Sequence, residues 1–355
     1  MRFPYKWTLA DATFTKDKGK VFSCFACGGG STMGYKLAGF DVLGCNEIDP
    51  KMIEAYKTNH KPKYAFLEPI QEFKLRDDLP QELYDLDILD GSPPCSSFSM
   101  AGNREEDWGK ERKFREGQAE QVLDTLFFDF IDLAKKLQPK VVIAENVKGL
   151  LIGDARAYVS RIYEHFDDAG YIVQHWLFNA SMMGVPQKRE RVFFIALRKD
   201  LAGPFLESVD MFTMAPRLKF EFNQKPIKFE EFYQKGVDDR PASRGKMFEY
   251  WSLRQKSDKN FADTLMRAYE KHSCFNNYYI HNDEVPNTFT SNADVFYLFD
   301  EYRKPNKQES CCIGSYPQDY DFGKNQYCYL IGMSVPPIMT AQVATQVYEQ
   351  WLSKL

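Results

Sequence analysis

The sequence predicts an α/β protein built on a doubly wound sheet, together with a smaller and mostly irregular domain. Between residues 20 and 198, short apolar runs alternate with segments in which apolar residues recur at helical spacing. This alternation is typical of strands connected by helices on both faces of one sheet. A glycine-rich turn follows the first apolar run, and a carboxylate ends the second. After Arg198 the periodicity weakens, and basic and aromatic residues interleave.

The composition narrows the class of protein. The chain has 355 residues, enough for one large domain and one smaller one. Its formal net charge of −4 gives no overall attraction for nucleic acid, so such a contact would depend on the local field. The eight cysteines are irregularly spaced and no secretory signal is present, so we expect free thiols and a cytoplasmic location. No apolar run is long enough for a membrane span, and no cysteine spacing indicates a metal site.

The first elements form a unit suited to a nucleoside. We expect a strand over 21–26, a glycine-rich turn into a helix from 27, and a strand over 40–49 that contains Glu47. Glycines allow close approach of the backbone to a ligand, and the acid accepts hydrogen bonds from ribose hydroxyls. Many helices simply begin at glycine, but the acid at the next strand end favours a nucleotide-like ligand. Because the six-position phosphate fingerprint is incomplete, a ligand without pyrophosphate fits better.

The βα alternation continues to residue 198. The expected helices and strands follow in this order: a helix over 50–59, a strand over 86–89, a helix over 121–137, a strand over 141–144, a helix over 154–169, and strands over 171–177 and 191–197. The strand over 141–144 is expected to stop at Glu145 and Asn146. A final amphipathic helix runs through Trp351.

Cys95 has the surroundings of a nucleophile. The strand before it stops at Gly91, and Pro93 and Pro94 stiffen the turn that carries the thiol. The polar segment 101–121 is long enough to cover the site as a lid. Most free cysteines are inert core residues, but a core residue does not need a rigid exit loop.

Further polar residues are expected at strand ends on the same edge of the sheet: Glu145, Gln187, Arg189 and Arg191. Such residues usually form structural salt bridges. A thiol, an acid and arginines at one edge also fit addition to an electron-poor ring, in which the thiolate attacks and the charged groups stabilise the ring nitrogen and oxygen.

With these residues the chain resembles the DNA (cytosine-5-)methyltransferases along nearly its whole length. The matching motifs occur in the family's order: 25–34, Asn46-Glu-Ile-Asp49, Gly91-Ser-Pro-Pro-Cys-Ser-Ser-Phe-Ser99, Glu145-Asn-Val-Lys-Gly149, Gln187-Lys-Arg-Glu-Arg191 and Gly332-Met-Ser-Val-Pro-Pro337. The resemblance implies a Rossmann-like S-adenosylmethionine-dependent methyltransferase fold, S-adenosylmethionine as cofactor and cytosine in double-stranded DNA as substrate. It also implies a catalytic domain over 1–198, a target-recognition domain over 199–324 and a segment 325–355 that returns to the catalytic domain.

The resemblance assigns roles to individual residues. Cys95 is similar to the nucleophile that adds to C6 of a flipped cytosine, and Glu145 to the acid at N3 and the exocyclic amine. Arg191 is similar to the group that holds the base oxygen, and Arg189 to its supporting partner. The residues similar to the cofactor pocket are Phe25, Gly29, Glu47, Ile48, Pro94, Ser334 and Val335.

The expected DNA contacts lie partly in the second domain: Ser99, Arg244, Lys246 and Arg254. Basic residues there interleave with Phe248, Tyr250 and Trp251. A charged stretch is often only a solvated surface, but interleaved aromatic residues favour a nucleic-acid contact.

Several residues depart from the family pattern. Cys27 replaces a glycine of the turn, Ser96 replaces a glutamine after the nucleophile, and Met333 replaces an asparagine of the last motif. The acid usual after the third strand has no match near Glu68 and Pro69. Two alternatives therefore stay open: an RNA cytosine-5 methyltransferase on the same scaffold, and a pseudoenzyme that binds DNA or cofactor without turnover. We expect a monomer, with a cognate restriction nuclease as a possible partner in a restriction-modification system.

Overall fold

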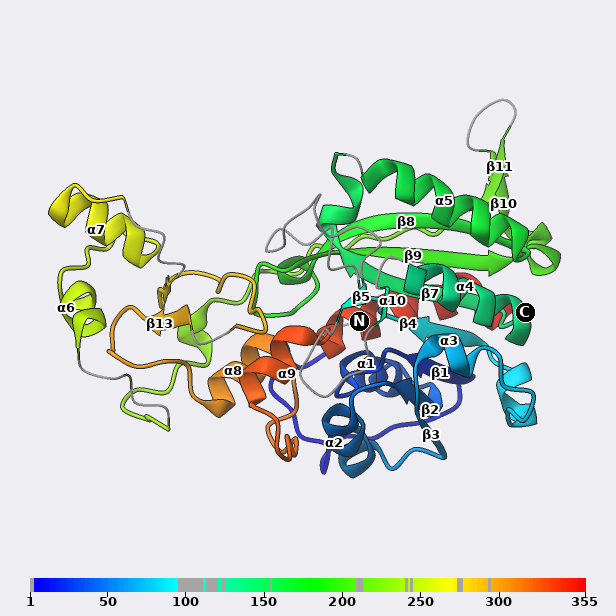
Figure 1. Ribbon diagram of the computed structural model, residues 1–355, viewed down its shortest axis with the longest axis horizontal. Helices are drawn as coiled ribbons and strands as arrows, with labels where there is room; N and C mark the ends of the chain where they lie inside the picture. The colour runs from blue at the N-terminus through cyan, green and yellow to red at the C-terminus, as the bar shows by residue number, and fades with distance from the viewer. Residues whose placement is uncertain are drawn as a thin grey trace.

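The computed structural model describes residues 3–94, 111–112, 121–122, 125–153, 155–208, 213–239, 242, 245–272, 277–292 and 295–355. Within these ranges the largest element is a seven-stranded sheet with strand order β3-β2-β1-β4-β7-β9-β8 (Figure 1). Its strands are β1 (Lys20–Cys24), β2 (Asp41–Glu47), β3 (Tyr64–Leu67), β4 (Ile88–Gly91), β7 (Val141–Val147), β8 (Tyr171–Asn179) and β9 (Glu190–Arg198).

The pairing of these strands places several chain turns at one edge of the sheet. Neighbouring strands from β3 to β7 are parallel, whereas β9 runs antiparallel to both β7 and β8. The beginning of β9 therefore lies at the same edge as the carboxyl ends of β4 and β7. Open α/β sheets bind their ligands at this edge. The doubly wound α/β sheet expected from the sequence is confirmed.

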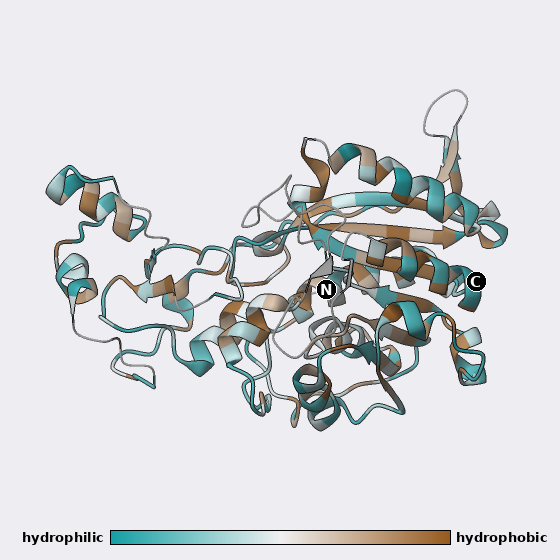
Figure 2. Cartoon of the chain, in the orientation of Figure 1, coloured by the Kyte–Doolittle hydropathy of each residue, from teal (hydrophilic) through white to brown (hydrophobic). Residues whose placement is uncertain are grey.

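Helices cover both faces of the sheet, so its central strands are buried along almost their whole length. One core cluster joins a sheet face to α3, α4 and α5, and a second joins the opposite face to α1 and α10. Figure 2 shows the hydrophobic residues that run along β9. The helices are α1 (Gly30–Leu37), α2 (Pro50–His60), α3 (Ile70–Phe73), α4 (Leu126–Leu137), α5 (Ala155–Asp168), α6 (Lys246–Ser252), α7 (Phe261–Tyr269), α8 (Lys307–Gly314), α9 (Tyr327–Met333) and α10 (Pro337–Gln350).

The last long helix packs directly on the first. Gly34 of α1 lies so close to α10 that a Cβ at this position would be 2.5 Å from the Cβ of Thr340. A residue with a side chain here would force the two helices apart. The end of the chain thus supports the helix that begins at the glycine-rich turn.

The structure differs from the expected elements in several places, including the strand expected over 86–89, which is observed as Ile88–Gly91. The strand expected to end before Glu145 continues to Val147, because its antiparallel partner β9 pairs with it over its whole length. The helix expected from residue 121 begins at Leu126, and Gln121–Val122 instead pairs, as β6, with Glu111–Arg112, as β5. The edge strand β3 and the single-turn α3 were not among the expected elements.

After β9 the chain leaves the sheet twice: at the pair of β10 (Leu206–Ser208) with β11 (Met214–Pro216) near one end of the molecule, and in a projecting segment, formed by the described residues between Phe229 and Pro305, at the other end (Figure 1). The projecting segment contains the short pair of β12 (Tyr278–Ile280) with β13 (Phe296–Leu298) and the helices α6 and α7, which lie at the end of the molecule away from the sheet. A third core cluster links this segment to the sheet side, because it contains Met33 and Met52 together with Phe229, Phe289 and Leu298.

Two further findings concern the composition. The described cysteines Cys24, Cys27, Cys45, Cys311, Cys312 and Cys328 are all free thiols. Among the helices of the described ranges, none has the length and apolar character that a membrane crossing requires.

Candidate active site

Glu145 and Arg191 form a buried ion pair across the two neighbouring strands β7 and β9. In the register of these strands Val147 lies opposite Arg191 and Glu145 lies opposite Phe193, so the acid and the base project from the same face. Arg191 Nε lies 2.8 Å from Glu145 Oε1, and the two side chains are only 15% and 11% exposed. Burial lowers the pKa of Arg191, while the charge of Glu145 opposes that change. Both residues were predicted from the sequence to lie at this edge, and the structure brings them together.

The turn that leads to Cys95 begins beside this ion pair. Gly91 at the end of β4 lies opposite Ala144, the residue before Glu145. Asn146 Nδ2 donates a hydrogen bond to the carbonyl oxygen of Pro93 over 3.1 Å, which ties the turn to β7. Cys95 itself, Ser99 and the expected lid over 101–121, apart from 111–112 and 121, lie outside the described residues.

Arg189 is buried two residues before Arg191, but its contacts differ from those expected. Its Nη1 donates to the carbonyl oxygens of Phe289 (2.9 Å) and Gly332 (3.1 Å), and Nη2 also donates to Gly332 (3.2 Å). Burial, with the nearby charge of Arg191, lowers the pKa of Arg189 to about 9, while Glu145 opposes the change. Arg189 thus holds two backbone segments from distant parts of the chain.

Glu47 ends β2 and fixes the glycine-rich turn. Its Oε2 accepts the N–H of Cys27 at 2.7 Å, and its Oε1 accepts the N–H groups of Ile48 and Asp49, each at 2.9 Å. Burial raises the pKa of Glu47 above its ordinary value, and these backbone donors act against that rise. Because each carboxylate oxygen carries two lone pairs, Oε2 retains one acceptor position for a further donor such as a ribose hydroxyl.

The glycine-rich turn has a left-handed backbone, and its cysteine packs into the protein. Cys27 has φ 50° and Gly29 has φ 84°, a region that costs a residue with a side chain about 1 kcal/mol or more. Cys27 Sγ lies 3.7 Å from Met52 Sδ and 3.6 Å from Ser334 Oγ. A Cβ on Gly29 would overlap the ring of His60. Cys27 therefore replaces the usual glycine by directing its thiol into contacts between α2 and the last motif.

The residues expected at the cofactor divide into two groups by exposure. Phe25, Ile48 and Pro94 are partly exposed, as a contact with a ligand requires. Ser334 and Val335 are buried, 3% and 5% exposed, and support the glycine-rich turn from behind. A partly exposed apolar surface next to a carboxylate with a remaining acceptor position is compatible with the adenosine part of S-adenosylmethionine.

Asp90 is a residue of this region that sequence reasoning missed. It lies on β4 directly before Gly91 and is 3% exposed. Its Oδ2 accepts the hydroxyls of Ser23 and Ser31, each at 2.7 Å, and its Oδ1 accepts that of Tyr35 at 3.0 Å. The carboxylate therefore joins β1, the first two turns of α1 and the strand that leads to Cys95. The signal was an aspartate placed between the apolar residues Ile88–Leu89 and Gly91 of a buried strand, since buried carboxylates are rare unless they have partners.

Burial raises the pKa of Asp90 to about 6 from 3.8, and the charge of Glu145 acts in the same direction. The native state therefore holds this proton more tightly than the unfolded chain does. The resulting stabilisation is fully present below pH 3.8 and is lost as the pH rises through about 6. We expect Asp90→Asn, which cannot titrate, to remove a pH-dependent contribution of up to about 3 kcal/mol. Urea unfolding of both proteins between pH 4 and 7 checks this: their difference in stability should change across the range, and a constant difference would contradict it.

Two of the expected DNA-contact residues lie in the projecting segment. Lys246 begins α6 and is exposed. Arg254 follows α6 and stacks on Trp251, with its Cζ 3.2 Å from the ring centroid. Its Nε donates to the carbonyl of Phe299 (2.6 Å) and its Nη1 to that of Trp251 (2.9 Å), so these donors already serve the fold. Arg244 lies outside the described residues.

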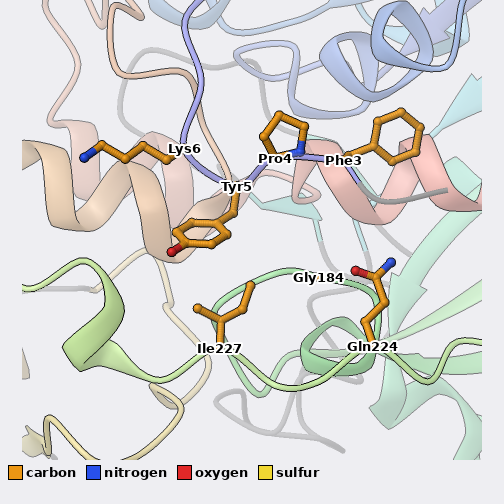
Figure 3. A pocket seen from close by; sticks show the side chains of 7 residues that line it. All are labelled: Phe3, Pro4, Tyr5, Lys6, Gly184, Gln224 and Ile227. Atoms are coloured by element: carbon orange, nitrogen blue, oxygen red, sulfur yellow. The ribbon is translucent and has the colours of Figure 1, made fainter.

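A cavity of about 380 Å³ is lined by none of the predicted site residues that the structure describes (Figure 3). The N-terminal residues 3–6, Gly184, Gln224 and Ile227 line it. Lys6 is its one ionisable side chain apart from Tyr5, so the lining offers no arrangement of an acid, a base and a nucleophile.

Comparison with known proteins identifies the family. A family model described as C-5 cytosine-specific DNA methylase matches residues 19–349. The chain belongs to this family. It is 37% identical over 182 residues to the Type II methyltransferase M.FnuDI of Fusobacterium nucleatum, an alignment that covers 51% of this chain and 48% of the relative. It is 36% identical to the Type II methyltransferase M.NgoPII of Neisseria gonorrhoeae over 52% of this chain and 50% of the relative. The chain therefore matches about half the length of these curated relatives.

Solved structures agree with this family at the level of the fold. A putative DNA modification methyltransferase encoded in an Escherichia coli prophage has a TM-score of 0.64 at 18% identity, covering 93% of this chain and 98% of the other. A mutant of the DNMT2 protein of Spodoptera frugiperda also has a TM-score of 0.64 at 18% identity, covering 93% of this chain and 99% of the other. The Rossmann-like methyltransferase fold implied by the family resemblance is confirmed.

Proposed function

We propose that the protein is a DNA (cytosine-5-)methyltransferase that acts on a cytosine flipped out of double-stranded DNA. The observation that carries the proposal is the buried Glu145–Arg191 pair beside the Pro93–Pro94 turn. An acid and a guanidinium in one site suit a ring that presents an N3–C2=O edge, because the acid protonates N3 and the guanidinium binds the oxygen. Membership of the C-5 cytosine-specific DNA methylase family supports the same substrate.

In the proposed reaction Cys95 adds to C6 of the cytosine, forming a C–S bond, while Glu145 stabilises the proton at N3. Addition turns C5 into an enamine-type carbon nucleophile. Methyltransferases of this kind generally use S-adenosylmethionine, which supplies an electrophilic methyl group on a sulfonium. After C5 is methylated, a water molecule takes the proton from C5; the electrons of that C–H bond re-form the C5=C6 double bond, and the C–S bond breaks to release the product and the thiolate. Flipping is needed because C5 and C6 are shielded within the stacked duplex.

The proposal gives the other predicted residues a place. Glu47 would hold the ribose through the remaining position on Oε2, with Ile48, Phe25 and Pro94 against the adenosine. Gly29, Ser334 and Val335 would shape the turn from behind. Recognition of the target sequence would fall to the segment after β9, with Lys246 and Arg244 toward the phosphates. We propose a cytoplasmic location, and a cognate restriction nuclease as partner, because the relatives are Type II methyltransferases.

The decisive experiment is covalent trapping. The target is first mapped by expressing the protein in a host without cytosine methylation and locating modified cytosines across the genome. A duplex with 5-fluorocytosine at the target should then form a stable adduct at Cys95 in the presence of S-adenosylmethionine, because the fluorine cannot leave as a proton does. Peptide mass spectrometry identifies the modified residue. Methylation of transfer RNA instead of DNA would identify an RNA methyltransferase, and no modification of either would indicate a pseudoenzyme.

A further inference from the structure

A short stretch before β9 runs beside a stretch of the projecting segment. Lys188 N–H donates to the carbonyl of Pro286 over 2.8 Å, and Lys188 forms a parallel bridge with Asn287. Thr288 Oγ1 donates to the carbonyl oxygen of Lys188 over 2.7 Å. The chain around residue 188 therefore forms the junction between the sheet and the segment that the proposed function assigns to target recognition.

Two buried side chains on either side of Lys188 hold this junction together. Gln187 is 1% exposed; its Oε1 accepts the N–H of Phe289 (3.1 Å), and its Nε2 donates to the carbonyl of Ile313 (2.7 Å). Arg189 is 2% exposed and donates to the carbonyl of Phe289. Both backbone groups of Phe289 are thus bound by side chains that precede Arg191.

The same contacts reach the last motif on the cofactor side. Arg189 also donates twice to the carbonyl of Gly332, which directly precedes Met333 and Ser334. Gly332 packs so tightly on the backbone of Thr290 that a Cβ there would overlap it. The stretch 286–290 and the stretch 332–335 therefore meet at Arg189.

We propose that Gln187 and Arg189 are positioning residues. They lock the 286–290 stretch and the 332–335 stretch to the strand that carries Arg191. Through these contacts, correct docking of DNA on the projecting segment sets the geometry of the Arg191–Glu145 pair. The inference rests on the proposed function for its consequence but not for its geometry. Phe289 connects these contacts to the projecting segment, because its ring stacks on Phe296 of β13 with 5.4 Å between the ring centroids.

A merely structural role predicts a different outcome. Buried polar side chains commonly satisfy backbone groups without any effect on function. In that case the loss of Gln187 would lower stability without changing target discrimination. Gln342 provides the matched control, because it is also a buried glutamine (4% exposed) that donates to a backbone carbonyl, that of Met183 on the α10 side.

The first arm of the test is hydrogen–deuterium exchange on the full-length protein. We expect Gln187→Ala to increase exchange both in 286–290 and in 332–335, whereas Gln342→Ala leaves these stretches as in the wild type. If exchange rises only at the N–H of Phe289, whose hydrogen bond is deleted, the proposed coupling between the stretches 286–290 and 332–335 is contradicted. This measurement does not require catalytic turnover, so it tests the inference even if the wild-type protein modifies no nucleic acid. Absence of any modification would refute the proposed function but not this inference.

The second arm measures how well the enzyme discriminates its target sequence from a related sequence. Single-turnover methylation of the mapped target is compared with that of a duplex changed at one flanking base. We expect Gln187→Ala to reduce the ratio of the two rates about tenfold, the effect of losing one or two buried hydrogen bonds. Gln187→Glu, which keeps the acceptor for Phe289, should recover part of this ratio, and Arg189→Lys should lower it because a single ammonium cannot reproduce the guanidinium fork. An unchanged ratio in a folded, active Gln187→Ala protein would overturn the inference.

Discussion

Cys95→Ser is expected to reduce methyl transfer on the order of 10³-fold or more while leaving DNA binding intact. A serine hydroxyl has a far higher pKa than a thiol, so it supplies no anion to attack C6, and C5 then never becomes nucleophilic. Incorporation of a labelled methyl group into the mapped target measures the transfer, and a gel-shift titration measures the binding.

Cys312→Ser is the matched control for this experiment. Cys312 is 3% exposed and lies on α8, away from the Glu145–Arg191 pair, and burial raises the pKa of its thiol to about 11. Its replacement tests whether loss of any thiol damages the protein. Substantial turnover by Cys95→Ser would refute the covalent mechanism, and equal losses in both variants would point to a folding defect.

Glu145→Gln is expected to lower the rate of methyl transfer on the order of 10²- to 10³-fold, with little effect on cofactor binding. The amide keeps an oxygen for Arg191 Nε, but it cannot share a proton with the ring nitrogen. It also leaves the buried charge of Arg191 without its counter-charge, a change that destabilises by a few kcal/mol when a partner is removed altogether. Single-turnover rates, calorimetric titration with S-adenosylmethionine and urea unfolding separate these effects.

Glu190 offers a control carboxylate next to the site. It precedes Arg191 on β9 and pairs with Lys148 at 2.8 Å, with 41% of its side chain exposed. Glu190→Gln should therefore leave the rate within about twofold, since exposed ion pairs contribute little. A near-normal rate for Glu145→Gln would show that Glu145 does not take part in the reaction. A comparable loss of rate in both variants would show that the local charge, rather than proton transfer at N3, sets the rate.

The sequence predicted the sheet and the meeting of Glu145 with Arg191, because both depend on strand ends that apolar runs reveal. It did not predict that β9 pairs antiparallel along the whole of β7, since strand direction is decided by tertiary pairing. The helix from 121 was misplaced because apolar spacing continues upstream of Leu126, whereas pairing with Glu111–Arg112 is not a periodic signal.

The contacts of single polar side chains were the least predictable part. Arg189 binds carbonyls 100 and 143 positions away in the chain, and backbone acceptors carry no residue identity that a pattern could show. Edge strand β3 escaped notice because Tyr64–Leu67 is short and only partly buried. The positions of Cys95, Ser99 and Arg244, the domain boundaries and the cofactor contacts stay predictions.

The seven strands of the sheet are complete at Arg198, before the projecting segment begins. Because the sheet needs no strand from that segment, we expect changes in the length and sequence of the segment to leave the strand order and the spacing of Glu145 and Arg191 unaltered. Such changes are constrained at 286–290, where the projecting segment contacts the chain that leads into β9. There the contacts are made mainly by main-chain atoms, so an altered segment must keep the backbone course at 286–290 more than it must keep the same side chains.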